Sequence, residues 1–180
     1  IISRLVGQKG FDLLPPVMER IMSLPLQMVV LGTGEKEMEA AFAEYAERWP
    51  ARLAVFLTFD NALAHQIEAG ADFFLMPSRY EPCGLNQMFS LRYGTIPVVH
   101  AVGGLKDTVV DPGQAAGSRA TGFCFERPNE DAFLHAIDRA LEYYSNRKQW
   151  RHLQRNGMAG DYSWKYRARE YLALYQSILT

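Results

Sequence analysis

The sequence predicts an α/β fold, a Rossmann-like domain in which helices flank a parallel sheet. Short apolar runs alternate with longer amphipathic stretches along most of the chain, which is the pattern of repeated strand–helix units. Several of these runs lead into glycine-containing turns, as expected where a strand gives way to a helix. With 180 residues, of which 48% are hydrophobic, the chain can fill the core of one such domain.

Six short apolar runs are expected to be the strands of the sheet. The pattern is clearest before Pro77, where an apolar run of strand length stops at a residue that typically marks a turn. The expected strands are residues 1–3, 26–31, 52–59, 72–76, 96–99 and 122–125.

The amphipathic stretches are expected to be helices. Met38, Phe42 and Tyr45 recur at three-and-four spacing and define the apolar face of one of them. Pro15 and Pro16 are compatible with a helix only in its first turn. The expected helices are residues 11–24, 35–49, 61–69, 85–93, 105–110, 130–144, 147–157 and 164–179.

Composition and charge exclude several classes of protein. Lys and Arg total 19 and Asp and Glu 20, a net charge of −1 without a dense basic block, so we expect no binding to nucleic acid or to a membrane surface. No apolar run reaches the roughly eighteen residues of a membrane span. Cys83 and Cys124 lack metal-ligand spacing, which predicts two reduced thiols and no metal site. Residues 111–121, rich in Gly, Ala and Ser, are expected to be a disordered loop.

Ligands of open parallel sheets bind at the carboxyl ends of the strands, so the loops that follow the strands should line one crevice. The first loop carries Arg4 and Lys9, which can hold a diphosphate by a guanidinium fork and a point charge. The alternative is two solvated surface cations. The turn at Gly32 and Gly34 is weaker, because such turns are common wherever a strand leads into a helix.

The loop at residues 77–85 is the most informative. Glu81 lies where it can grip sugar hydroxyls, close to Cys83, and the backbone N–H groups of Gly84 and Leu85 would face an anion at the start of the next helix. The alternatives are that Glu81 caps this helix and that Cys83 is a small packing residue. A second glycine turn leads into a helix at Gly103, Gly104 and Leu105. By itself it does not distinguish a ligand site from an ordinary turn before a helix.

Seven segments together resemble the C-terminal domain of bacterial glycogen synthases and plant-type starch synthases. The resemblance spans nearly the whole chain, and PSRYEPCGL followed by RYGTIPVV is its most specific part. The segments are, in order, ISRLVGQKGFDLL, LGTGE, FDNALAH, GADFFLMPSRYEPCGLNQMFSLRYGTIPVV, VGGLKDTV, TGFCF and YSWKYRAREYLALY.

The resemblance implies the donor-binding half of a GT-B glycosyltransferase, which moves glucose from ADP-glucose to the non-reducing end of an α-1,4-glucan with retention. No metal cofactor is implied. The acceptor would bind mainly through an N-terminal domain, so residues 1–180 alone are expected to be inactive. Residues 163–180 would form a helix that packs toward that N-terminal domain. The alternative is that its aromatic residues belong to the core of this domain. The implied location is the bacterial cytoplasm, or a plastid for a plant-type protein.

The resemblance also implies roles for single residues. Arg4 and Lys9 match the basic pair that holds the nucleotide diphosphate, and Glu81 matches the functional glutamate beside the donor glucose. Phe59 stands where a tyrosine usually stacks on adenine, with core packing as its alternative. The substrate-binding residues implied by the matching segments are Phe59, Cys83, Gly84, Leu85, Gly103, Gly104 and Leu105. At the second glycine turn, the N–H of Gly104 or Leu105 would remain available although Val102 replaces the usual threonine.

Two other functions stay open at this point. The chain can be a retaining glycosyltransferase that uses a UDP- or GDP-sugar. It can also be a non-catalytic nucleotide-binding Rossmann module. The presence of Arg4, Lys9 and Glu81 together disfavours the second of these. A dehydrogenase is disfavoured because no Gly-x-Gly-x-x-Gly motif follows the first strand.

Overall fold

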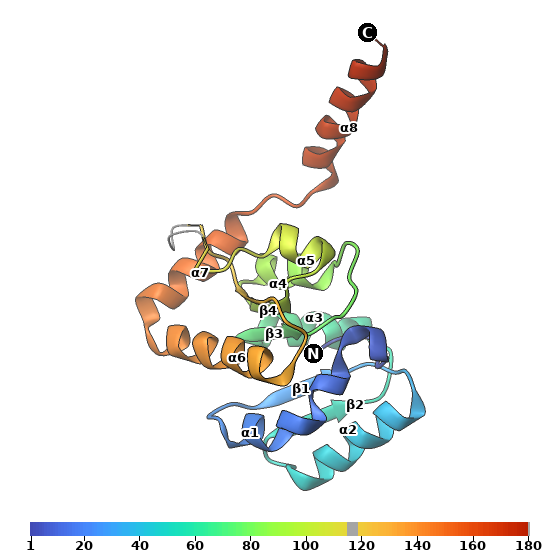
Figure 1. Cartoon of the computed structure of the whole chain (residues 1–180), viewed down its shortest axis with the longest axis vertical. Helices are drawn as coiled ribbons and strands as arrows, with labels where there is room; N and C mark the ends of the chain where they lie inside the picture. The colour runs from blue at the N-terminus through green and yellow to red at the C-terminus, as the bar shows by residue number, and fades with distance from the viewer. Residues whose placement is uncertain (115–118, 180) are drawn as a thin grey trace.

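A computed structural model of the chain describes residues 1–114 and 119–179 and contains two parallel sheets (Figure 1). One sheet pairs β1 (Met28–Leu31) with β2 (Leu53–Phe56), and Val30 lies opposite Val55. The other sheet has the order β3-β4-β5, formed by Phe73–Met76, Ile96–His100 and Phe123–Phe125. The α/β class expected from the sequence is therefore confirmed.

The first residues of the chain run alongside β1, on the edge opposite β2. Parallel bridges join Ile2 to Leu31 and Leu5 to Gly34, so the strand expected at residues 1–3 is reduced to isolated bridges. The Asn86 side chain donates to the Ile2 carbonyl at 2.8 Å, which ties this segment to the residues that follow β3. Figure 1 shows the N-terminus in the middle of the molecule, between β1 and the second sheet.

Helices flank both sheets. Contacts join α2 to β2, α4 and α6 to β4, and α7 to both α4 and α6. The helices are α1 (Met18–Ser23), α2 (Lys36–Arg48), α3 (Asn61–Gly70), α4 (Asn86–Tyr93), α5 (Gly103–Thr108), α6 (Glu130–Ser145), α7 (Arg147–Ala159) and α8 (Trp164–Leu179). Three 3-10 turns, Gly7–Lys9, Phe11–Leu13 and Pro15–Val17, precede α1.

The single helix expected over residues 11–24 was wrong in its first half. Two 3-10 turns occupy residues 11–13 and 15–17, and α1 begins only at Met18. Pro15 and Pro16 have no N–H to donate, so an α-helical ladder cannot form until the chain has passed them.

Two loop boundaries also differ from expectation. The strand expected to reach residue 59 ends at Phe56, and Leu57 is already exposed. The expected disordered loop is ordered at both ends: Asp111 and Thr121 are buried, and Asp111 accepts from the Cys124 N–H at 2.7 Å. Arg139 also forms an ion pair with Asp111. Residues 115–118 of that loop lie outside the described residues.

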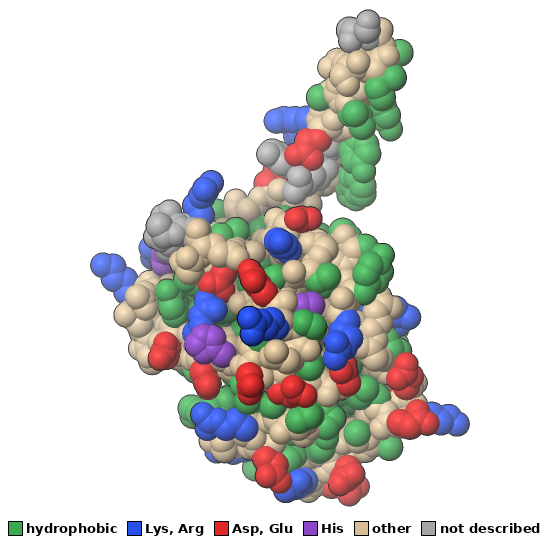
Figure 2. Space-filling model, viewed as in Figure 1, with side chains coloured by type: hydrophobic (Ala, Val, Ile, Leu, Met, Phe, Trp, Pro, Cys, Tyr) green, Lys and Arg blue, Asp and Glu red, His purple; other side chains and the backbone are tan. Residues whose placement is uncertain are grey.

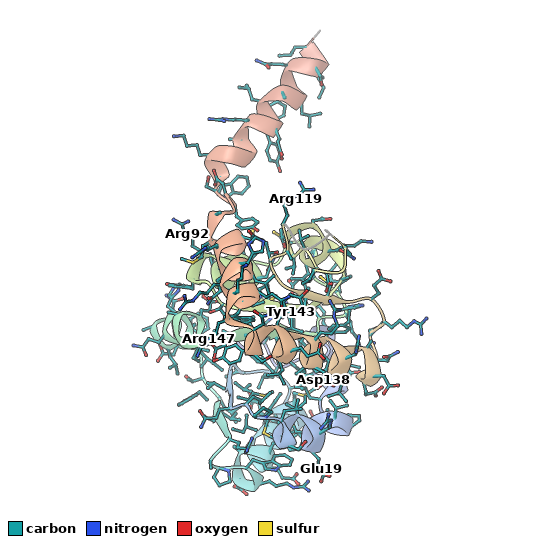
Figure 3. All side chains as sticks on the ribbon, turned by 90° about the vertical axis from the view of Figure 1, so that its left-hand side faces the viewer. Glu19, Arg92, Arg119, Asp138, Tyr143 and Arg147 are labelled. Carbon is teal, nitrogen blue, oxygen red and sulfur yellow. The ribbon has the colours of Figure 1, made fainter. Side chains whose placement is uncertain are left out.

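Aromatic side chains carry much of the packing between helices and sheets. Phe11 meets Phe42 edge-on at 5.8 Å between ring centroids, which joins the second 3-10 turn to α2. Tyr143, labelled in Figure 3, reaches from α6 to β5, where its ring lies 5.2 Å from that of Phe123. Edge-to-face pairs of this kind add stabilisation beyond the apolar area that they bury.

One cavity lies at the amino ends of the strands, away from the crevice expected from the sequence. It measures about 700 Å³ and is lined by residues of β1 and β3 such as Met28, Val29, Phe73 and Leu75. Ligands of parallel sheets bind at the carboxyl ends of the strands, so the site is expected at the edge opposite this cavity.

Helix α8 projects away from the rest of the domain (Figure 1). Trp164 is 77% exposed, and Tyr171, Tyr175 and Ile178 are also exposed. Figure 2 shows hydrophobic side chains gathered along one side of this helix. The alternative that these aromatic residues belong to the core of the domain is therefore wrong.

No helix in the described part of the chain combines the length and apolar character that a membrane crossing requires.

We expect the buried carboxyl of Glu68, on α3, to make stability depend on pH. Burial raises the pKa of Glu68 from 4.5 to about 7. The protonated Glu68 carboxyl contributes fully to the stability of the fold below pH 4.5, and this contribution is lost as the pH rises through 7. Glu68→Gln should therefore match the parent in free energy of unfolding near pH 4.5 and exceed it by roughly 2 kcal/mol at pH 8.

The measurement is urea unfolding at both pH values. Glu37→Gln on exposed α2 is the control for the change in net charge. A difference between Glu68→Gln and the parent that does not change with pH would contradict the prediction.

Candidate functional site

An ion pair between Lys9 and Glu81 lies at the carboxyl edge of the sheets. The Lys9 Nζ atom is 2.5 Å from Glu81 Oε2, although the two residues are 72 positions apart in the chain. Their side chains are only 18% and 11% exposed. The structure thus brings together the lysine and the glutamate that the sequence singled out in different loops.

Backbone contacts between two loops place Lys9 beside Glu81. Gly10 has a φ of 72°, and a Cβ atom there would lie 1.9 Å from the Pro77 carbonyl oxygen, so only glycine fits. The Arg79 N–H donates to the Gln8 carbonyl at 3.0 Å.

A forked ion pair strengthens this junction. Arg79 donates to both carboxylate oxygens of Asp12, at 3.2 and 2.5 Å. The Arg79 hydrogen bond lowers the pKa of Asp12. The loop of Lys9 and the loop of Glu81 therefore form one unit.

Ser78 and His100 fix Glu81 from behind. The buried Ser78 hydroxyl donates to Glu81 Oε2 at 3.1 Å. His100 Nδ1 lies 2.7 Å from the Ser78 carbonyl oxygen, and its Nε2 lies 3.2 Å from that of Glu126. A neutral imidazole can donate to one of these carbonyls, and an imidazolium to both. Ser78 was not predicted from the sequence. Its only signal there is its position, three residues before Glu81.

Glu81, Cys83 and Gly84 lie in the loop that leads into α4. Its N-cap position is Leu85, without a side-chain cap, so the alternative that Glu81 caps this helix is wrong. Cys83 is exposed, which also argues against a packing role. Gly84 has a φ of 69°, in the left-handed region. A helix start without a side-chain cap leaves N–H groups for an anion.

The second glycine turn supports the Glu81 loop. The Gly104 N–H donates to the Glu81 carbonyl at 3.0 Å, and the Leu105 N–H donates to Val102 at 3.1 Å. The expectation that the N–H of Gly104 or Leu105 remains available to a ligand is therefore wrong, because both are bonded to backbone carbonyls. The Leu105 side chain is fully buried, so it contributes to the core. Gly103 is exposed at the start of α5.

Two predicted residues lie at the same edge without a contact to the ion pair. Arg4 is exposed and follows the segment that pairs with β1. Phe59 is 90% exposed, three residues beyond the end of β2, which overturns the core-packing alternative for it. Its ring is accessible for stacking on a flat ligand.

The second cysteine and the metal expectation can be placed as well. Cys124 is a buried free thiol whose pKa burial raises to about 12, with Asp111 as the next cause. Such a thiol is unreactive. Among the described residues, no group of three His, Cys, Asp or Glu side chains is arranged to hold a metal ion. That the protein needs no metal stays a prediction.

A small pocket marks the centre of the site. It measures about 90 Å³ and is lined by Lys9, Ser78, Glu81 and Asn86 among others. Drug-sized ligands occupy pockets of about 300–1,000 Å³. The pocket formed by the described residues is therefore well below the size of a drug-sized ligand site.

Comparison with known proteins identifies relatives over nearly the whole chain. The family described as glycosyl transferases group 1 matches residues 1–156. The chain is 51% identical over 178 residues to a glycogen synthase of Marinobacter nauticus, covering 99% of this chain and 36% of that protein. A glycogen synthase of Anaeromyxobacter sp. is 53% identical, with 99% and 37% covered. The chain thus spans little more than a third of the length of these relatives.

Solved structures agree with this relationship. The catalytic domain of starch synthase IV from Arabidopsis thaliana, bound to ADP and acarbose, superposes with a TM-score of 0.89 at 34% identity. The match covers 98% of this chain and 37% of that one. Sucrose-phosphate synthase from Thermosynechococcus elongatus, at 24% identity and a TM-score of 0.72, shares the fold over 98% of this chain and 44% of its own.

We expect the Lys9–Glu81 pair to couple more strongly than an exposed ion pair. Removing one partner leaves a charge that is mostly covered, so Lys9→Met or Glu81→Gln alone should cost more than the double change. A double-mutant cycle from urea unfolding should give a coupling of about 1–2 kcal/mol.

The exposed pair of Arg48 and Glu19, whose side chains are 55% and 71% exposed, is the matched control. Its coupling should stay below about 0.5 kcal/mol. Equal coupling in both cycles would show that the Lys9–Glu81 pair is no more than a surface contact.

Proposed function

The chain belongs to the group 1 glycosyl transferases, and we propose that it is the donor-binding part of a glycogen or starch synthase. The complete protein would transfer glucose from ADP-glucose to the non-reducing end of an α-1,4-glucan, with retention at the anomeric carbon. Its relatives at about half identity are glycogen synthases, and its starch synthase neighbour was solved with ADP bound, which supports this donor.

One observation carries the proposal: a lysine and a glutamate meet at the start of a helix, at the carboxyl edge of a parallel sheet. When the bond from glucose C1 to the diphosphate breaks, the leaving group gains negative charge. Lys9 and the amino end of α4 supply positive charge at this place, and Arg4 would add to it from the same edge. Glu81 would orient the glucose and stabilise positive character at C1.

The lysine separates two negative groups in this arrangement. A carboxylate and a diphosphate close together repel each other, and Lys9 already bonds Glu81 at 2.5 Å. With a donor bound, the same ammonium would lie between Glu81 and the phosphates. The positions of Lys9 and Glu81 thus fit a sugar that lies between the Glu81 carboxylate and the diphosphate.

The remaining walls of the site would come from a further part of the protein. The 90 Å³ pocket is too small for a nucleotide sugar, and closure of a second domain would complete it and exclude water. We propose that α8 packs on that second domain with its exposed aromatic side, and that the glucan binds mainly there. A cytoplasmic or plastid location, and independence from metal, belong to this proposal.

Two other functions remain as alternatives to test. A UDP- or GDP-sugar can replace ADP-glucose in a protein with this fold. A non-catalytic module would bind a nucleotide without transfer. A non-catalytic module does not explain why a covered carboxylate is held by both a lysine and a buried serine. A UDP- or GDP-sugar transferase differs from the proposal only in the nucleotide that it binds.

We expect the 180-residue chain to bind ADP weakly but specifically. Calorimetric titration should show ADP binding more tightly than UDP or GDP. Because each charged contact to a phosphate is worth about 1–2 kcal/mol, Lys9→Ala and Arg4→Ala should each weaken ADP binding about tenfold.

The exposed cation Arg20, on α1, is the matched control, and Arg20→Ala should bind ADP like the parent. Preference for UDP or GDP would favour another sugar nucleotide. Absence of nucleotide binding in a folded sample would refute donor binding by this chain.

We expect Glu81→Ala in the complete protein to lower kcat at least a hundredfold, about 3 kcal/mol of transition-state stabilisation. The KM for ADP-glucose should change little, because the phosphates provide most of the donor affinity. Steady-state kinetics with a glucan acceptor provide the measurement. Glu35→Ala, at the exposed start of α2, is the control. Unchanged turnover in Glu81→Ala would remove this residue from the mechanism.

A further inference from the structure

A fully buried glutamine lies beneath the start of α4. The Gln87 Nε2 atom is 3.2 Å from the Cys83 carbonyl, 3.2 Å from the Gly84 carbonyl and 3.1 Å from Thr108 Oγ1. Its two hydrogens are therefore shared among three acceptors, two in the loop before α4 and one at the end of α5. Its Oε1 atom has no hydrogen-bond partner among the described residues.

Thr108 continues this chain of hydrogen bonds into the second glycine turn. Its hydroxyl accepts from Gln87 and donates to the Gly104 carbonyl at 2.6 Å. The backbone N–H of Gly104 is also bonded: it donates to the Glu81 carbonyl. Gln87 and Thr108 thus connect the loop before α4 to the carbonyl of Gly104, and the Glu81 backbone connects the same loop to its N–H.

The two loops are in backbone contact where these bonds hold them. A Cβ atom on Gly104 would lie 1.9 Å from the Cys83 carbonyl oxygen, and one on Gly84 would lie 2.4 Å from Gln87 Oε1. No side chain fills the space between the loops. Their relative position therefore depends on a few hydrogen bonds.

We propose that Gln87 and Thr108 are positioning residues that hold the Cys83–Gly84 segment against the Gly103–Gly104 turn. Neither needs to touch the ligand. They fix the backbone at the start of α4 in the geometry that receives the diphosphate of the nucleotide sugar. This inference rests on the proposed donor-binding function and assigns part of its affinity to two residues outside the ligand contacts.

A purely structural role would have a different signature. If Gln87 only satisfied buried carbonyl groups, breaking its bond to Thr108 would lower stability and leave the ADP affinity of the folded protein unchanged. A positioning role predicts that ADP affinity falls while the protein stays folded, and that a residue with the same hydroxyl restores it.

The test compares Thr108→Val with Thr108→Ser. Valine keeps the shape of threonine and removes the hydroxyl, whereas serine keeps the hydroxyl. We expect Thr108→Val to bind ADP about five- to tenfold more weakly than the parent, the effect of one hydrogen bond, and Thr108→Ser to bind within about twofold. Calorimetric titration with ADP measures the affinity, and urea unfolding checks that each variant is folded.

The outcomes separate the two proposals. Absence of ADP binding in the parent would refute the proposed function, and with it this inference. ADP binding by the parent and equally by Thr108→Val would overturn only the inference. In a second comparison, Gln87→Met combined with Thr108→Val should weaken ADP binding by less than the sum of the two single losses, because the two residues share one hydrogen bond. Additive losses would contradict this.

Discussion

Close contact between loop backbones is the constraint on which this site depends. Gly10 meets Pro77, and Gly104 meets Cys83, at places where a Cβ atom would lie 1.9 Å from a carbonyl oxygen. The first contact joins the N-terminal segment to the loop after β3, and the second joins that loop to the start of α5. The chain can bring charged residues together at this edge only because glycine lets the loops touch without side chains between them.

The electrostatics of the site follow from that geometry. Once the first loop lies on the loop after β3, Lys9 has Glu81 as its neighbour, and a mostly covered ion pair forms. Burying a carboxylate costs free energy unless several groups bond it, and here Lys9 and Ser78 both donate to the same oxygen. The other carboxylate oxygen has neither of these partners. A carboxylate held from one side in this way is arranged to meet a ligand from the other.

Periodicity predicted the α/β class and most helices, because α2, α6 and α7 carry strong amphipathic patterns. It failed at residues 11–17, where Pro15 and Pro16 allow only 3-10 turns. The rule that ligands bind at the carboxyl ends of strands predicted that Lys9 and Glu81 share a crevice. Ser78 and Gln87 escaped prediction, because a buried serine or glutamine differs from an exposed one only through contacts that form in the fold.

The same contacts explain why the site is well formed in its backbone and yet open to solvent. Backbone hydrogen bonds join the loops of this domain and bring Lys9, Glu81 and the start of α4 together within this chain. The pocket between them is nevertheless about 90 Å³, roughly three water molecules in liquid volume. A preformed wall lowers the ordering cost of binding, whereas exclusion of water requires a second surface. Under the proposed function, donor capture and catalysis would be separable: this wall would hold the phosphates, and closure of a second domain would create the dry environment for transfer.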